Sequence, residues 1–215
     1  ASGALLTHLK RIRDGGDVNG KDGHGHTALP LAALKGQEAL VRLLVAKGAN
    51  VNSCAPDGST ALTVAAANGK DAIVRFLLDT GADVDRKSSD GSTPLMQAAA
   101  NGHNTTVRLL LGKGADANAR QKRGQTGLMW AAYKGNQTAV GLLLEKGADV
   151  NASDDDGNTV LMAAVEGGGV QMVNMLVEKG ANVNAQNLRG ETALLRAEAK
   201  RRSELVGILK ANGAK

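Results

Sequence analysis

Small and apolar side chains recur along the chain at a fixed interval and mark out two kinds of helical segment. In each interval a leucine and an alanine stand two and five positions after a threonine, and another leucine stands seventeen positions after it. The first pair has the three-residue spacing of one buried helix face, and the second leucine belongs to a longer amphipathic stretch. The pattern predicts a short helix, a tight turn and a longer helix, repeated many times.

The interval is 33 residues long and continues without an insertion or deletion. Self-similarity at such a period is typical of solenoids, in which each repeat packs only on its neighbours. We number positions within a repeat as offsets from its threonine. These threonines are Thr27, Thr60, Thr93, Thr126, Thr159 and Thr192.

Residues with special backbone preferences predict where the helices begin and end. The threonines are expected to be N-caps, and Pro94 suits a first helical position. The first helices are expected to end at glycines, because glycine adopts the left-handed conformation of a helix end. These are Gly36, Gly69, Gly102, Gly135 and Gly168. Second helices are expected over ranges such as 38–47 and 136–146, and Asp-Gly or Arg-Gly pairs before each threonine predict projecting, hairpin-like turns, here called tips.

Two segments carry a family resemblance. Residues 91–102, Gly-Ser-Thr-Pro-Leu-Met-Gln-Ala-Ala-Ala-Asn-Gly, and residues 147–151, Gly-Ala-Asp-Val-Asn, closely resemble the ankyrin repeat. The resemblance covers residues 15–215 and implies an all-α solenoid of stacked helix-turn-helix units with projecting β-turn or hairpin tips. The family usually has histidine at offset +3, bridging adjacent turns, so apolar packing is expected to replace that bridge here. This offset holds Pro30, Thr63, Met96, Met129, Met162 and Leu195.

The ends of the array carry substitutions expected of caps. Glu198 and Lys210 replace apolar residues in the last repeat, and Arg201 replaces the helix-ending glycine. A single apolar-faced helix over 4–13 precedes the first repeat, and we expect one domain over residues 1–215. Its predicted parts are an N-terminal cap (1–26), full repeats (27–59, 60–92, 93–125, 126–158 and 159–191) and a C-terminal cap repeat (192–215). Because the sequence does not begin with Met, we expect a processed product or an excised segment.

Composition narrows the functional classes. The net charge is +5, but residues 192–215 contribute six cations against two anions, so the excess lies at one end rather than along a continuous stripe. Nucleic acid is therefore not an expected partner. We also expect no membrane span, since no apolar run approaches the roughly 18–20 residues needed to cross a bilayer, and no secretory signal. One cysteine, Cys54, excludes an intrachain disulfide and favours a reducing, cytoplasmic location. Polar caps favour a monomer.

Groups able to perform catalysis are sparse and scattered. The histidines are His8, His24, His26 and His103. The best metal candidate combines His24 and His26 with Cys54 and Asp57. Its spacing matches no established ligand pattern, and polar turn residues are the simpler explanation. We therefore expect no catalytic residues, no metal, no cofactor and no small-molecule substrate. The chain is predicted not to be an enzyme.

The resemblance implies that offsets +4, +7 and +8 line a concave groove, which together with the tips binds partners. Trp130 and Tyr133, the only Trp and Tyr of the chain, both lie in these columns. Such residues are enriched at interface anchors. The alternative is that Trp130 lies across its neighbours and only covers the first helix. The basic tip before Thr126 faces the acidic Asp154–Asp156 tip; the two either pair with each other or steer an acidic partner. The predicted partner-binding residues are Trp130, Tyr133, Lys134, Gln97, Asn101, Arg120, Lys122 and Arg123.

These observations favour a non-catalytic module or scaffold that binds a segment of another protein. Two alternatives stay open. One is a structural or regulatory ankyrin segment of a larger polypeptide. The other, less favoured, is binding of nucleic acid or an anionic surface through Lys200, Arg201 and Arg202.

Overall fold

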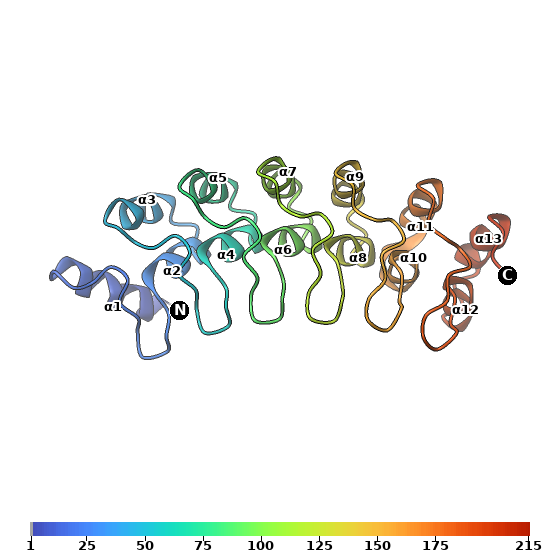
Figure 1. Cartoon of the computed structure of the whole chain (residues 1–215), viewed down its shortest axis with the longest axis horizontal. Coiled ribbons are helices and arrows are strands. Elements are labelled where there is room, and N and C mark those ends of the chain that lie inside the picture. Colours follow the sequence, from blue (N-terminus) through green and yellow to red (C-terminus); the bar gives the residue numbers. More distant parts are fainter. Residues whose placement is uncertain (1) are drawn as a thin grey trace. The chain divides into compact units, whose positions relative to one another are not determined.

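The chain folds into pairs of helices joined by loops, as the computed structural model shows for residues 2–215 (Figure 1). Ala1 lies outside the described residues. The described part is helical without a sheet, so the predicted all-α fold of helix-turn-helix repeats is confirmed. The elements are α1 (Ser2–Arg13), α2 (Ala28–Leu34), α3 (Glu38–Ala46), α4 (Ala61–Ala67), α5 (Asp71–Asp79), α6 (Pro94–Ala100), α7 (Asn104–Gly112), α8 (Gly127–Tyr133), α9 (Gln137–Glu145), α10 (Val160–Ala163), the π-helical turn η1 (Ala164–Gly168), α11 (Gly169–Glu178), α12 (Ala193–Ala199) and α13 (Ser203–Ala211).

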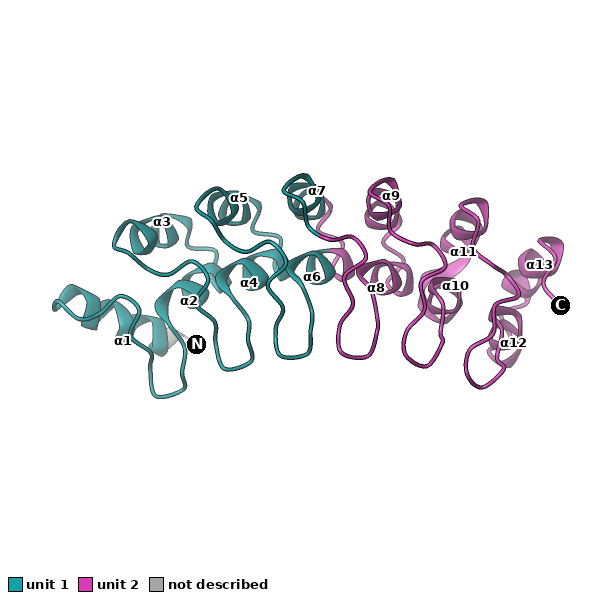
Figure 2. Cartoon of the chain, viewed as in Figure 1, with its two compact units in different colours: residues 1–98, 105–115 teal, residues 99–104, 116–215 magenta. Residues whose placement is uncertain are grey.

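Two compact units divide the chain (Figure 2). Unit 1 comprises residues 1–98 and 105–115, and unit 2 comprises residues 99–104 and 116–215. Within unit 1, α2 packs beside α4, and α3 packs beside α5. Within unit 2, α8 packs against α10 and η1, while α11 packs against α13. The expectation of a single domain stays a prediction, as does the concave groove that the resemblance implies.

The repeated apolar positions form the core of each unit. The leucines at offsets +2 and +17 and the alanines at offset +5 are almost all fully buried, as their periodic spacing predicts. Met96, Met129 and Met162 at offset +3 are also buried, so apolar packing does occupy the usual histidine position there. Leu195 is an exception, because its side chain is 50% exposed.

Threonine caps begin most of the first helices. The hydroxyl oxygens of Thr60, Thr126, Thr159 and Thr192 each accept a hydrogen bond from the backbone N–H three residues later. Thr27 does not cap α2 in this way, which corrects the sequence-based expectation for the first repeat. Its hydroxyl lies 3.1 Å from that of Ser53 instead, so a hydrogen bond to the next tip replaces the cap.

Asparagine side chains connect the loops between repeats, a ladder that the sequence analysis missed. In unit 1 the side-chain N–H of Asn19 donates to the carbonyl of Gly48, and its Oδ1 accepts from the backbone N–H of Asn50. Asn52 repeats the pattern in unit 1, and Asn118, Asn151 and Asn184 repeat it in unit 2. These bonds provide contacts between the turns of successive repeats.

The fifth repeat departs from the predicted helix end. Its first helix finishes in η1, and the left-handed residue is Gly169, with φ of 81°, rather than the predicted Gly168. A Cβ atom on Gly168 would overlap the carbonyl oxygen of Ala132, and one on Gly167 would overlap that of Tyr133. The glycines therefore let the π-helical turn approach the end of α8 closely.

One described stretch, Val160–Glu178, has the length and apolar composition of a membrane-crossing helix, which corrects the expectation that no segment reaches that length. It is a helix pair rather than one straight rod, because the backbone of Gly169 leaves the helical region between η1 and α11. Of this stretch, 44% is buried inside the fold. These features are those of core helices and give only weak support for a span.

Candidate functional site

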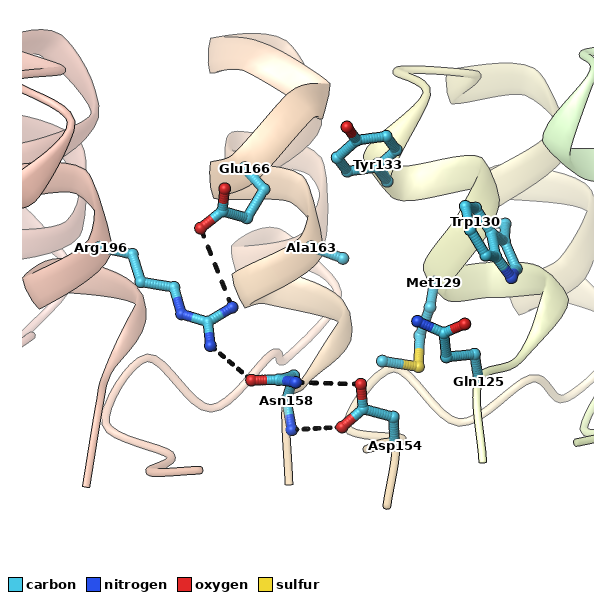
Figure 3. Close-up of a pocket in the computed structure, with 9 residues that line it drawn as sticks. All are labelled: Gln125, Met129, Trp130, Tyr133, Asp154, Asn158, Ala163, Glu166 and Arg196. Carbon is cyan, nitrogen blue, oxygen red and sulfur yellow. Dashed lines mark hydrogen bonds and ion pairs between the residues drawn. The ribbon is translucent and has the colours of Figure 1, made fainter. Parts of the chain in front are cut away.

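The first candidate site is a pocket of about 280 Å³ that lies wholly within unit 2 (Figure 3). It is formed by α8, by the tip that precedes α10, by α10 with η1, and by α12. We call it the unit-2 pocket. Its lining residues are Gln125, Met129, Trp130, Tyr133, Asp154, Asn158, Ala163, Glu166 and Arg196.

Two aromatic side chains from α8 form one wall. Trp130 and Tyr133 meet edge to face, with ring centroids 6.3 Å apart and an interplanar angle of 88°. Trp130 is half-buried and Tyr133 is 43% exposed, so neither ring is sealed in the core. Lys134 Nζ lies 5.7 Å from the centroid of the Tyr133 ring, which places a cation at the edge of the wall.

The floor of the pocket is small. Ala163 occupies offset +4 of the fifth repeat, where the other repeats carry Leu31, Val64, Gln97, Trp130 and Arg196. Its methyl group lies between the aromatic wall and Arg196 in Figure 3. The hollow thus depends on the small side chain of Ala163, which stands between Trp130 and Arg196 at offset +4 of successive repeats.

The opposite wall is a network of paired charges. Arg196, whose side chain is 17% exposed, lies 2.8 Å from Glu191 Oε2 and 3.9 Å from Glu166 Oε1, and it also donates to Asn158 Oδ1. Lys200 Nζ lies 2.7 Å from Glu166 Oε2. The hydrogen bonds from Arg196 and Asn187 hold the pKa of Glu191 below its usual value, so this carboxylate stays ionised. These contacts hold the Arg196 side chain in place on this side of the pocket.

Asp154 is satisfied within its own tip. Its Oδ1 accepts from the backbone N–H groups of Asp156 and Asn158 at 3.0 and 2.8 Å, and its Oδ2 accepts from Asn158 Nδ2 at 3.0 Å. This arrangement is an Asx-type turn that orders the tip. Asp154 thus has hydrogen-bond donors, although no cation pairs with it in the described part of the chain.

The predicted site residues fall into separate places. Trp130 and Tyr133 line the unit-2 pocket, Lys134 borders it, and Asn101 is exposed at the end of α6 without lining it. Gln97 belongs to unit 1 and lines a different pocket. The prediction missed the polar wall, above all Glu166 and Arg196, although both stand in the offset columns that carry the aromatics.

The two charged tips pair with each other, which is one of the two arrangements that the sequence left open. Arg120 Nη2 lies 3.2 Å from Asp155 Oδ1, and Arg123 Nη2 lies 3.9 Å from Asp156 Oδ2. Arg120 also donates to the carbonyl of Ser153 at 2.7 Å. Lys122 is exposed and has no acidic partner within residues 2–215. Exposed pairs of this kind contribute about 0–1 kcal/mol each, so a partner can compete for them.

Two further features bear on possible chemistry, the placement of metal-ligating side chains and the charge of the C-terminal repeat. Across the described residues, no group of three or more His, Cys, Asp or Glu side chains is placed to hold a metal ion. The basic C-terminal repeat is partly neutralised, because Lys200 pairs with Glu166 and Lys210 pairs with Glu198 at 3.0 Å. Such pairing reduces the number of cations available for phosphate groups.

Comparison with known proteins identifies the family. The family model for ankyrin repeats (3 copies) matches residues 2–88 and 84–154, and that for ankyrin repeats (many copies) matches residues 143–197. A search of the curated proteins finds no match. Ankyrin repeats are generally protein–protein interaction modules and are typically non-catalytic. Since these matches together cover most of the sequence, the chain belongs to the ankyrin repeat family.

Proposed function

We propose that the chain is a non-catalytic interaction module that binds a segment of a partner protein at the unit-2 pocket. The observation that carries the proposal is the placement of Trp130 and Tyr133, the only Trp and Tyr in the sequence, beside a pocket with an alanine floor. Aromatic walls supply large contact area at low cost in conformational entropy, and interface anchors concentrate in such hollows. An apolar side chain of the partner would rest on Ala163 against Trp130.

The charges around the pocket favour an acidic flank beside this apolar anchor. Lys122 and Lys134 are exposed, and neither forms an ion pair with a described carboxylate. The nearby carboxylates Asp155, Asp156 and Glu166 all lie within 4.0 Å of a cation. Uncompensated cations at the rim accelerate association with an acidic segment and orient it.

A pocket-filling variant tests the proposal. Ala163→Leu places a larger side chain where the first repeat already carries Leu31, so the helix should tolerate it while the hollow is filled. Wild type, Ala163→Leu and the control Ala39→Leu, on the exposed face of α3, are used to capture proteins from the native source. We expect a protein that wild type and Ala39→Leu retain and that Ala163→Leu loses, with affinity reduced at least about thirtyfold if the anchor is a hot spot of 2 kcal/mol or more.

Fluorescence then locates the bound segment. Because Trp130 is the sole tryptophan, its emission reports directly on this pocket. Titration with the captured protein's shortest binding fragment should shift the emission maximum, and a Trp130→Ala, Tyr133→Ala variant should stay folded by circular dichroism yet lose the fragment. Retention of the same proteins by Ala163→Leu, or an unchanged emission at saturation, would contradict the proposal. Affinity that falls steeply with salt and persists in Ala163→Leu would instead favour the basic C-terminal repeat.

A further inference from the structure

Unit 1 contains a second hollow that the proposed function does not use. It has a volume of about 420 Å³ and lies wholly within unit 1, where we call it the unit-1 pocket. α2, α4 and α6 contribute to it, together with the tips that precede α4 and α6. Its lining residues are Leu34, Asp57, Ser59, Thr63, Val64, Ala67, Asn68, Ser88, Ser89, Asp90 and Gln97.

One side of the unit-1 pocket is apolar and open to solvent. Leu34 is 44% exposed, although it is a large hydrophobic residue, and Val64 and Ala67 are half-buried beside it. An exposed leucine in a hollow leaves apolar area that a ligand can cover. The pocket therefore favours a ligand with a hydrocarbon portion.

The tips supply two carboxylates at the same pocket. Asp57 Oδ1 accepts from the hydroxyl of Ser59 at 2.6 Å and from its backbone N–H at 3.0 Å. Asp90 Oδ1 accepts from Ser88 Oγ at 2.7 Å, and its Oδ2 accepts from Ser92 Oγ at 2.8 Å. The Ser59 hydrogen bonds keep the pKa of Asp57 below its ordinary value; for Asp90 partial burial acts in the opposite direction, but the serine hydrogen bonds outweigh it.

Among the described residues neither carboxylate has a cation at ion-pair distance, and a titratable base, His26, acts on Asp57 and helps to lower the pKa of Asp57. None of the lining residues is Lys, Arg or His, and neither Asp57 nor Asp90 forms a salt bridge. Both side chains are exposed overall, so their carboxylates are accessible to a ligand. The unit-1 pocket therefore combines an apolar wall with two negatively charged carboxylates.

We propose that the unit-1 pocket binds a lysine or arginine side chain of a partner polypeptide. Such side chains place an aliphatic stem on apolar surface while their charged end stays at the polar edge. Here the stem would lie along Leu34, Val64 and Ala67, and the charged end would reach Asp57 and Asp90. This site is independent of the unit-2 pocket, and it holds or fails whether or not an apolar anchor binds beside Trp130.

Capped tripeptides provide a direct test by ¹H–¹⁵N correlation NMR on the full chain. The probe is acetyl-Ala-Arg-Ala-amide, and the matched control is acetyl-Ala-norleucine-Ala-amide, which keeps an aliphatic stem without charge. We expect saturating shifts of the Ser59, Asn68 and Ser89 amides with the arginine peptide, and affinity at least about tenfold weaker for the norleucine peptide, since an ion-paired end carries the difference.

Variants of the two aspartates separate a specific site from general attraction. Asp57→Asn with Asp90→Asn preserves oxygens that can accept from the serines, so the tips should stay ordered while affinity falls about tenfold or more. The control is Asp83→Asn, an exposed aspartate outside the pocket, at an offset where other repeats carry Asn50 and Asn182. Absence of saturation, equal affinity for the norleucine peptide, or equal losses in both variants would each overturn the proposal.

Discussion

The two pockets lie in corresponding places of different repeats, yet their chemistry is opposite. In unit 1 the hollow has Leu34 and Val64 as its apolar side and Asp57 and Asp90 as uncompensated acids. In unit 2 it has aromatic rings on one side, and of its two lining carboxylates Glu166 is paired with cations while Asp154 accepts only from N–H groups of its own tip. The backbone repeat sets where a hollow forms, whereas a few side chains in the columns decide what it can hold.

The tips show how this difference arises without a change of backbone. In both units a tip N–H donates to a carbonyl of the preceding tip, as with Ser89 N–H to Asp57 O at 2.8 Å and Asp155 N–H to Arg123 O at 3.1 Å. At the same repeat position, however, unit 1 carries Asp57 and unit 2 carries Arg123. Arg123 pairs with Asp156 of the next tip, whereas Asp57 supplies no cation to the tip that carries Asp90.

The largest effect on stability should come from the close contact between Gly168 and α8, both of which belong to unit 2. Gly168 has φ of −78°, which alanine adopts freely, but its added Cβ would overlap the carbonyl oxygen of Ala132. We expect Gly168→Ala to lower the free energy of unfolding by about 3 kcal/mol, the upper range for overpacking. Gly141→Ala in α9, where a Cβ meets open space, should instead add about 0.5–1 kcal/mol. Urea denaturation measures both, and equal effects would show that the close approach is not required.

Removing one cation should make the unit-2 pocket resemble the unit-1 pocket. Arg196→Met leaves Glu166 and Glu191 without this partner, and we expect a loss of about 2 kcal/mol from breaking charge-assisted hydrogen bonds in a half-buried network. The acidified pocket should also gain affinity for the arginine tripeptide, visible as a change in Trp130 emission. Lys210→Met, which removes an exposed pair with Glu198, serves as the control and should change stability by less than about 1 kcal/mol. No gain in peptide binding would mean that charge alone does not distinguish the pockets.

A smaller gain in stability is expected at the last repeat. Arg201 has φ of 54° and is, among the described residues, the one non-glycine with a positive φ. Since glycine adopts this region without steric cost, Arg201→Gly should stabilise unit 2 by about 1 kcal/mol and raise its Tm. Arg202→Gly should do the reverse, because Arg202 Nη1 donates to the carbonyl of Val165 at 2.9 Å. Thermal unfolding followed by circular dichroism compares them, and a lower Tm for Arg201→Gly would contradict the strain argument.

The smallest effect on stability near neutral pH is expected from His8, a buried histidine of unit 1. His8 is 1% exposed, its Nδ1 accepts from Arg11 Nη2 at 3.0 Å, and its Nε2 lies 3.7 Å from Asp22 Oδ2, with His26 on the other side of Asp22. Burial, and then the charge of Arg11, lower the pKa of His8 from 6.5. The unfolded chain therefore binds a proton more readily than the folded chain, so stability should fall as the pH drops below 6.5.

Variants isolate this acid sensitivity. His8→Gln keeps an acceptor for Arg11 and should flatten the dependence of stability on pH between 6.5 and 3.8, the range above the ordinary pKa of Asp22. His24→Gln, at an exposed position, should leave the dependence as in the wild type. Equal slopes in the wild type and His8→Gln would exclude His8 as the source.

Sequence periodicity predicted the helices closely, because burial of regularly spaced residues determines them. The second helix of the fourth repeat, expected over 136–146, spans Gln137–Glu145. It could not predict η1, because that turn depends on the fit of Gly167 and Gly168 against carbonyls of α8. The offset columns of the repeat indicated Trp130 and Tyr133 as candidate site residues. They did not indicate the network around Arg196, because its partners come from three separate segments. Pairing across space leaves no periodic signal in one sequence.

The asparagine ladder has a consequence for how such a chain can change its length. Each of its bonds joins residues 29 or 31 positions apart, so it reaches the neighbouring loop and no farther. Deleting or duplicating a whole block of 33 residues would give every asparagine an equivalent loop to hold, whereas a gain or loss of a few residues would misalign the donors and acceptors. Growth by complete copies is thus the change that this architecture accommodates most readily.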